Sequence, residues 1–314
     1  MPRIDSRLRT ALAGISGILV TPFDADDAIA PARLGPIVDR AISAGVHSLV
    51  ANGNTSEFYA LSMREAEAMV HAAAEHVRGR APLVGGVGKS VVDACRLARA
   101  SRNAGASALM VHQPPDPFVA PRGVVAYVER IAEAADGLPL LLYLRNDAIG
   151  LDAIDALCRV PGVAGVKWAC PTPLRLAEAI RRGDPDIVWI DGLAEPWAPP
   201  MFAVGARGFT SGLINVWPEH SMAIHEALSR GDFDQAGRLI AMIAPFEELR
   251  AEEQNGSNVT IVKAALAMLG QDCGPTRPPS AWPPSEAQSA RLRERLQSWG
   301  LLDAPRERMM APRA

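Results

Sequence analysis

The chain has 314 residues, of which 48% are hydrophobic and 21% charged, and its formal net charge is −3. These values are typical of a globular protein with a sizeable core, and they offer no basic stripe for nucleic acid. No apolar run approaches the roughly 20 residues that would span a bilayer, so no membrane partner is expected.

Apolar runs of the β type alternate along the chain with alanine-rich amphipathic segments. Strands are predicted over residues 15–20, 47–51, 83–87, 108–111, 140–143, 163–167, 187–190 and 208–211. Helices are predicted between them, over segments such as 31–44, 63–78, 91–104, 123–135 and 173–182. This alternation predicts parallel strands joined by helical crossovers, in a sheet that is covered on both sides.

Two folds fit this pattern: a closed (β/α)8 TIM barrel and a doubly wound open sheet. The sequence has no GxGxxG after the first strand and no Walker GxxxxGK[ST] motif. Polar residues instead follow several different strands, as in a barrel whose site is built from the C-terminal ends of its strands. We therefore predict a (β/α)8 TIM barrel.

The alternation stops near residue 231, and three helices are predicted over 233–250, 259–269 and 285–299. The expected organisation is a catalytic barrel over 14–231 and a C-terminal helical domain over 232–302. Residues 1–13 and 303–314 are expected to be flexible termini. Four widely spaced cysteines form no CxxC or Cys/His cluster, and no signal peptide is evident, so we expect reduced thiols and a cytoplasmic protein.

Lys167 is the strongest candidate for a catalytic residue, because it follows the apolar run Val163–Val166 at the end of a predicted buried strand. Tyr143 ends another such strand. A buried lysine commonly escapes the cost of desolvation through a lowered pKa, which leaves a neutral, nucleophilic amine. Such an amine beside a phenol is suited to Schiff-base chemistry on a carbonyl. The alternative is a surface lysine just past a strand end.

The loop after the second predicted strand contains Gly53, Asn54, Thr55 and Ser56. Small residues with free N–H groups and hydroxyls at a strand-to-helix turn make an anion site, which a substrate carboxylate could occupy. The alternative is helix capping by Thr55 or Ser56.

These motifs, in this order, resemble the dihydrodipicolinate synthase/N-acetylneuraminate lyase family of class I aldolases over roughly residues 14 to 302. The matching elements are Gly53-x-Thr55-x-Glu57, Tyr143, Gly165-Val166-Lys167, and Gly205-Ala206-x-Gly208-x-x-Ser211 with Asn215. The resemblance implies that Lys167 forms a Schiff base with a 2-oxo acid, that Tyr143 relays protons, and that Thr55 binds the substrate carboxylate. It also implies that no metal or organic cofactor is needed, and that the chain forms a homodimer or homotetramer.

Departures from the family pattern narrow the expected substrate. Asn54 replaces the first threonine of the synthases, the loop 113–118 lacks their tyrosine, and Ala148 stands where they carry an arginine. The stretch from Tyr143 to Ala148 resembles that of 5-dehydro-4-deoxyglucarate dehydratases instead. Trp168, where that branch usually carries an acidic residue, is expected to narrow the pocket.

Three further side chains are candidates for substrate binding, each with an alternative role. Arg145 could clamp a distal carboxylate or form a structural salt bridge with Asp147 or Asp191. Ser211 and Asn215 could bind substrate hydroxyls or satisfy loop backbone groups. Thr210 precedes them at the end of the last predicted strand.

The leading hypothesis is a Schiff-base lyase that dehydrates and decarboxylates 5-dehydro-4-deoxyglucarate or a related sugar acid. One rival is an aldolase or synthase that releases or condenses pyruvate. A second is a non-catalytic 2-oxo-acid sensor, in which Lys167 would be unreactive. A third is a metal-dependent barrel hydrolase, but the six histidines form no ligand cluster in the sequence.

Overall fold

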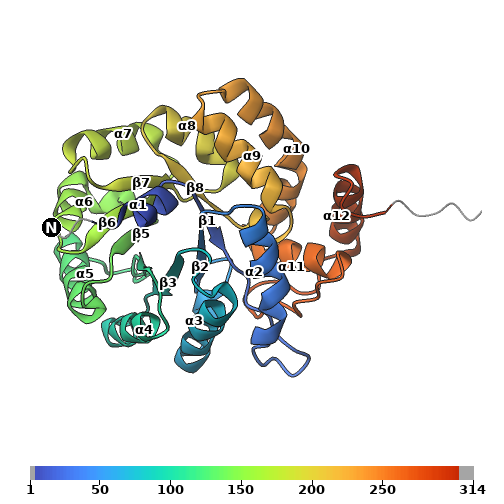
Figure 1. Cartoon of the computed structure of the whole chain (residues 1–314), viewed down its shortest axis with the longest axis horizontal. Coiled ribbons are helices and arrows are strands. Elements are labelled where there is room, and N and C mark those ends of the chain that lie inside the picture. The colour runs from blue at the N-terminus through green and yellow to red at the C-terminus, as the bar shows by residue number, and fades with distance from the viewer. Residues whose placement is uncertain (1–3, 304–314) are drawn as a thin grey trace, which may run out of the picture.

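The computed structural model describes residues 4–303 and contains one closed barrel of eight parallel strands, ringed by helices (Figure 1). Each strand pairs with the next along the chain, and the last pairs with the first. The predicted (β/α)8 TIM barrel is therefore confirmed. The strands are β1 Ile15–Ile18, β2 Ser48–Ala51, β3 Leu83–Val87, β4 Ala108–His112, β5 Leu140–Leu144, β6 Val163–Trp168, β7 Val188–Asp191 and β8 Gly208–Ser211.

Helices cover the outside of the barrel and continue beyond it. Those that follow the strands are α2 Gly35–Ser43, α3 Met63–Val77, α4 Val91–Asn103, α5 Pro121–Ala135, α6 Leu151–Cys158, α7 Pro173–Arg182, α8 Ala198–Ala203 and α9 Pro218–Ser229. The predicted C-terminal extension consists of α10 Phe233–Ala251, α11 Asn258–Met268 and α12 Glu286–Ser298. Figure 1 shows these three helices gathered on one side of the barrel.

The N-terminal segment is helical, so the prediction of a flexible segment over 1–13 is wrong for the residues of α1 Ser6–Leu12. Asp5 caps this helix by accepting a hydrogen bond from the backbone N–H of Arg7. Leu8 and Leu12 are buried against side chains inside the barrel. The burial of these two leucines stabilises a helix that would be too short to persist alone. Residues 304–314 of the predicted C-terminal tail lie outside the described residues.

Side chains along each strand alternate between the barrel interior and the layer under the helices. This alternation decides which side chains at the strand ends face the interior. Leu141 and Tyr143 of β5 belong to the interior cluster, whereas Leu142 and Leu144 pack against the helices. Neighbours in a parallel sheet that stand in register point to the same side. Lys167, which is paired with Tyr143, therefore faces the interior.

Within residues 4–303, no helix combines the length and the apolar character needed to cross a membrane.

Candidate active site

Lys167 is a buried amine at the C-terminal end of β6, and only 3% of its surface is exposed. Its side chain passes Gly192, where a Cβ would stand 2.9 Å from Lys167 Cγ, so a larger residue would obstruct it. Burial lowers the pKa of Lys167 to about 7, an effect that the nearby Asp191 partly opposes. The alternative of a surface lysine is therefore wrong. An amine that is neutral near pH 7 can attack a carbonyl carbon.

Tyr143 lies directly against this amine. The Nζ of Lys167 is 3.8 Å from the centroid of the Tyr143 ring. Burial raises the pKa of Tyr143 to about 12, so the phenol keeps its proton at neutral pH. Asn54 Nδ2 donates a hydrogen bond of 2.9 Å to the phenol oxygen. The structure thus brings together Lys167 and Tyr143 with the loop that follows β2.

Some polar groups of the loop after β2 are hydrogen-bonded within the protein. Ser56 Oγ accepts from the N–H of Gly53 (3.0 Å) and donates to the carbonyl oxygen of Leu19 (2.5 Å). The prediction that Ser56 and the amide of Gly53 bind substrate is therefore wrong, because both are occupied within the protein. Helix α3 is capped by Ser62, so the capping role considered for Thr55 and Ser56 is also wrong. Asn54 and Thr55 remain as candidates from this loop.

Only one of the two hydroxyl residues at the end of β8 faces the barrel interior. Thr210 is paired with Ser16 of β1, which lies on the same face as the interior residue Ile18. Ser211 points outward and donates to Glu195 Oε1 (2.5 Å), which also accepts from Ser221. The prediction that Ser211 binds substrate is wrong, because a residue next to an interior position on a strand faces the other side.

Asn215 is a structural residue at the junction of β8 and β1. Its Nδ2 donates to the carbonyl oxygens of Ile18 and Gly212, both at 2.8 Å. Its Oδ1 accepts from the N–H of Val20 at 3.2 Å. The side chain is fully buried and all its donors and acceptors are paired. The prediction that Asn215 binds substrate is therefore wrong, and the alternative of satisfying loop backbone groups is correct.

Arg145 follows Tyr143 closely and is solvent-exposed. The salt bridge considered between Arg145 and Asp147 is not formed. Asp147 instead accepts a hydrogen bond from Thr172 Oγ1 (2.8 Å) and lies 3.4 Å from Arg175 Nε. Burial raises the pKa of Tyr59, and the nearby Arg145 opposes that rise. The exposed guanidinium of Arg145 lies near the Tyr143 phenol, where it is accessible to a soluble anion.

Trp168 does not narrow the pocket, contrary to the prediction. It is fully buried in the layer between the strands and the helices, where its ring centroid lies 6.3 Å from that of Trp189. Trp168 follows the interior residue Lys167 directly on the strand, so it must face outward.

His112 is a site residue that the sequence analysis missed. It ends β4, stacks on Phe58 with centroids 4.5 Å apart, and meets the Tyr143 ring at 5.4 Å. Its Nε2 donates to the carbonyl oxygen of Asn52 at 2.9 Å. Burial lowers the pKa of His112 to about 3, so the ring is neutral and packs as an aromatic. Its position at a strand's C-terminal end was the available signal. Residues 4–303 contain no cluster of three His, Cys, Asp or Glu side chains that could hold a metal ion.

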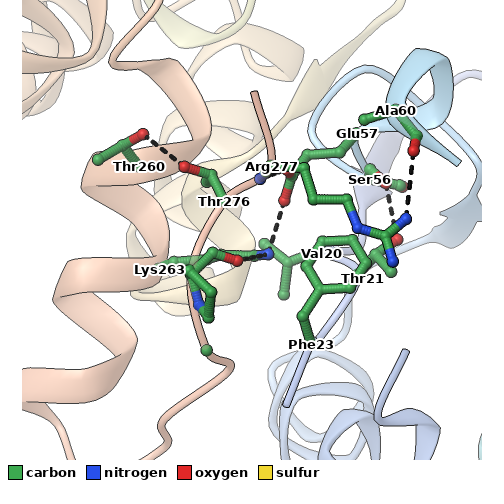
Figure 2. Close-up of polar contacts among 12 residues, drawn as sticks. Val20, Thr21, Phe23, Ser56, Glu57, Ala60, Thr260, Lys263, Thr276 and Arg277 are labelled. Carbon is green, nitrogen blue, oxygen red and sulfur yellow. Dashed lines mark hydrogen bonds and ion pairs between the residues drawn. The ribbon is translucent and has the colours of Figure 1, made fainter. Parts of the chain in front are cut away.

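A buried ion pair ties the β2 loop to the C-terminal helices. Lys263 of α11 lies 2.6 Å from Glu57 Oε1 and also donates to the carbonyl oxygen of Pro275 at 2.8 Å. Glu57 Oε2 accepts from the backbone N–H of Arg277 at 2.8 Å. Figure 2 shows Lys263 and the Arg277 segment meeting Glu57 from the side of the C-terminal helices. The extension therefore holds the loop that presents Asn54 and Thr55.

The chain is similar to known proteins over most of its length. The family model described as the dihydrodipicolinate synthetase family matches residues 11–298. The chain is 34% identical over 292 residues to a probable 5-dehydro-4-deoxyglucarate dehydratase 2 of Streptomyces coelicolor, covering 91% of this chain and 89% of that one. It is 30% identical over 290 residues to a 4-hydroxy-tetrahydrodipicolinate synthase of Syntrophobacter fumaroxidans, covering 90% and 97%.

A solved structure is similar along nearly its whole length. The dihydrodipicolinate synthase from Bacillus clausii superposes with a TM-score of 0.89 at 40% identity, covering 93% of this chain and 99% of that one. The names of these relatives differ in the reaction they describe. This chain belongs to the dihydrodipicolinate synthetase family and is a lyase of the class I aldolase type.

Proposed function

We propose that this chain forms a Schiff base between Lys167 and a 2-oxo acid, and that it dehydrates and decarboxylates 5-dehydro-4-deoxyglucarate or a related sugar acid. The observation that carries the proposal is the buried amine of Lys167 against the ring of Tyr143. Burying an unpaired ammonium costs free energy of folding. A use of the neutral amine in chemistry explains why this lysine is nevertheless buried at a strand end.

The proposed chemistry follows from the protonation states of the Lys167 amine and the Tyr143 phenol. The neutral amine of Lys167 attacks the carbonyl carbon of the 2-oxo acid, and the carbonyl oxygen leaves as water after the phenol of Tyr143 supplies a proton. The resulting protonated imine accepts the electron pair released when a neighbouring C–H or C–C bond breaks. The Tyr143 phenolate, which gave up its proton when the imine formed, takes the proton of the C–H bond that breaks. It then gives this proton to a hydroxyl on the next carbon, which leaves as water.

The substrate part of the proposal rests on charge and on the relatives. Arg145 is exposed beside Tyr143 and lacks the salt bridge to Asp147, so it is available to a distal carboxylate. The planar guanidinium suits bidentate carboxylate binding. A sugar acid with a carboxylate at each end has a second carboxylate for Arg145 to bind, whereas pyruvate has none. Several relatives carry the name 5-dehydro-4-deoxyglucarate dehydratase.

Borohydride trapping tests the mechanism and the substrate together. The protein is incubated with 5-dehydro-4-deoxyglucarate or with pyruvate, reduced, digested and mapped by mass spectrometry. We expect the adduct on Lys167 with both acids and at lower concentration with the sugar acid. The chain has three lysines, so unlabelled Lys89 and Lys263 serve as internal controls. A folded protein that is never labelled on Lys167 would refute the proposal, and equal labelling with no CO2 release would favour a pyruvate aldolase.

The Tyr143→Phe variant is expected to lower turnover by roughly 10²–10⁴-fold, the usual effect of losing a proton-transfer group. The substitution keeps the ring that packs on Lys167 and removes only the hydroxyl that Asn54 contacts. Steady-state kinetics measures the effect. Tyr127→Phe is the matched control, because Tyr127 donates to the carbonyl oxygen of Lys89 on the outside of the barrel. An effect below about threefold would mean that the phenol only packs.

A further inference from the structure

Arg250 of α10 reaches the end of β8 from the C-terminal helices. A Cβ at Gly212 would stand 2.6 Å from Arg250 Nη2 and 3.2 Å from Thr55 Oγ1. The guanidinium and the Thr55 hydroxyl therefore lie on the same side of Gly212, and only glycine leaves room for both. Arg250 is only 4% exposed.

The donors of Arg250 are only partly used within the protein. Its Nη1 donates to both carboxylate oxygens of Glu247, at 2.7 and 2.8 Å, and its Nη2 donates to Asn258 Oδ1 at 2.9 Å. A guanidinium carries five N–H groups. Among the described residues, the buried Nε has no partner. Nη2, the nitrogen nearest Gly212 and Thr55, carries two N–H groups and makes one hydrogen bond, to Asn258, among the described residues. Its second N–H is therefore available to an acceptor that arrives with the ligand.

We infer that Arg250 binds, together with Thr55, the carboxylate next to the reacting carbonyl of the 2-oxo acid. This inference rests on the proposed function, because it takes Thr55 as part of the substrate site. Asn54, the residue before Thr55, reaches the phenol of Tyr143, so a carboxylate at Thr55 lies on the β2 and β8 side of that phenol. Arg145 stands on the β5 side. The two arginines would then bind the two ends of a dicarboxylic sugar acid.

Glu247 makes the substitution of Arg250 alone ambiguous, since it would leave a carboxylate without its partner. The test therefore uses the double variant Arg250→Gln with Glu247→Gln, which removes both charges. The probes are pyruvate and its neutral ester methyl pyruvate, each trapped on Lys167 with borohydride. In the double variant the half-saturating pyruvate concentration is expected to rise roughly ten- to hundredfold, as for the loss of a charged hydrogen bond. The half-saturating concentration of methyl pyruvate should stay within about threefold of its value for the wild-type protein.

Arg238→Gln on an exposed part of the same helix is the matched control and should leave both values unchanged. An equal loss for pyruvate and its ester would mean that Arg250 only supports the fold. No loss for either would equally overturn the inference.

A binding measurement separates this inference from the proposed function. Pyruvate should stabilise the protein against heat even in a Lys167→Met background, and the double variant should abolish that stabilisation. If no acid labels Lys167 but this pattern holds, the Schiff-base proposal fails and the role of Arg250 stands. If pyruvate stabilises the Lys167→Met protein equally with and without Arg250, the inference is wrong.

Discussion

The Lys167→Met variant is expected to lose all measurable turnover and, at the same time, to gain stability at neutral pH. Turnover is lost because methionine has no nitrogen to form the imine, while its chain fills much of the same space. Stability rises because the folded protein no longer holds an amine whose pKa is lowered by burial to about 7. Burial of this amine therefore lowers the stability of the wild-type fold, while it makes the amine nucleophilic.

The gain in stability should depend on pH in a definite direction. A lysine in the unfolded chain has a pKa of about 10.4, so it binds its proton more tightly than the folded protein does. Below pH 7 both states are protonated and the penalty on the fold is complete. Between pH 7 and about 10 the unfolded state alone is protonated, and the penalty disappears as pH rises, by about 1.4 kcal/mol per pH unit.

Chemical denaturation of both proteins from pH 6 to pH 10 measures this difference. At pH 6 we expect the free energy of unfolding of Lys167→Met to be higher than that of the wild type by a few kcal/mol, the order of magnitude that corresponds to this pKa shift. The two proteins should converge near pH 10. Lys89→Met is a graded comparison: burial also lowers the pKa of this half-buried lysine, so its removal should show the same trend to a smaller degree. A stability difference that is constant over this range would show that the amine of Lys167 titrates normally in the folded protein.

The fold was predictable because its signals are local and repeated. Apolar runs and amphipathic segments alternate through the barrel, and each strand ends at polar residues. Lys167 and Tyr143 were predictable for the same reason, since each ends an apolar run. The N-terminal helix was missed because α1 owes its stability to the burial of Leu8 and Leu12 in the barrel, which no local pattern reveals.

The wrong predictions for Trp168 and Ser211 share one physical cause. Proximity in sequence to a strand end does not determine which face of the sheet a side chain occupies. Trp168 and Ser211 stand one residue beyond interior positions and therefore face the helices. Applying the two-residue period outward from Lys167 and Thr210 would have corrected both.

The contributions of the C-terminal helices could not be predicted from motifs. Arg250 and Lys263 meet the β2 loop from positions far along the chain, and neither lies in a local pattern that points to this contact. Lys263 lies in α11, but its side chain is completely buried against Glu57.

Lys263→Met is expected to destabilise the protein by about 3–5 kcal/mol, the usual cost of breaking a buried ion pair by removing one partner. Glu57 would keep its bond from the N–H of Arg277 but lose its countercharge in a site with 3% side-chain exposure. The double variant Glu57→Gln with Lys263→Met removes both charges and should recover much of that loss. Equilibrium denaturation measures all three proteins.

The comparison of these variants separates the charge of Lys263 from its packing. The Lys263 amine also lies 4.2 Å from the Phe23 ring centroid, a contact that the methionine chain can largely replace. If packing alone mattered, the single variant would be nearly as stable as the wild type, and the double variant would gain nothing. If the pair holds the β2 loop, as Figure 2 indicates, the single variant should also need more pyruvate to label Lys167, because Thr55 belongs to that loop. If Lys263→Met is strongly destabilised but needs no more pyruvate to label Lys167, the Lys263–Glu57 pair contributes only to stability.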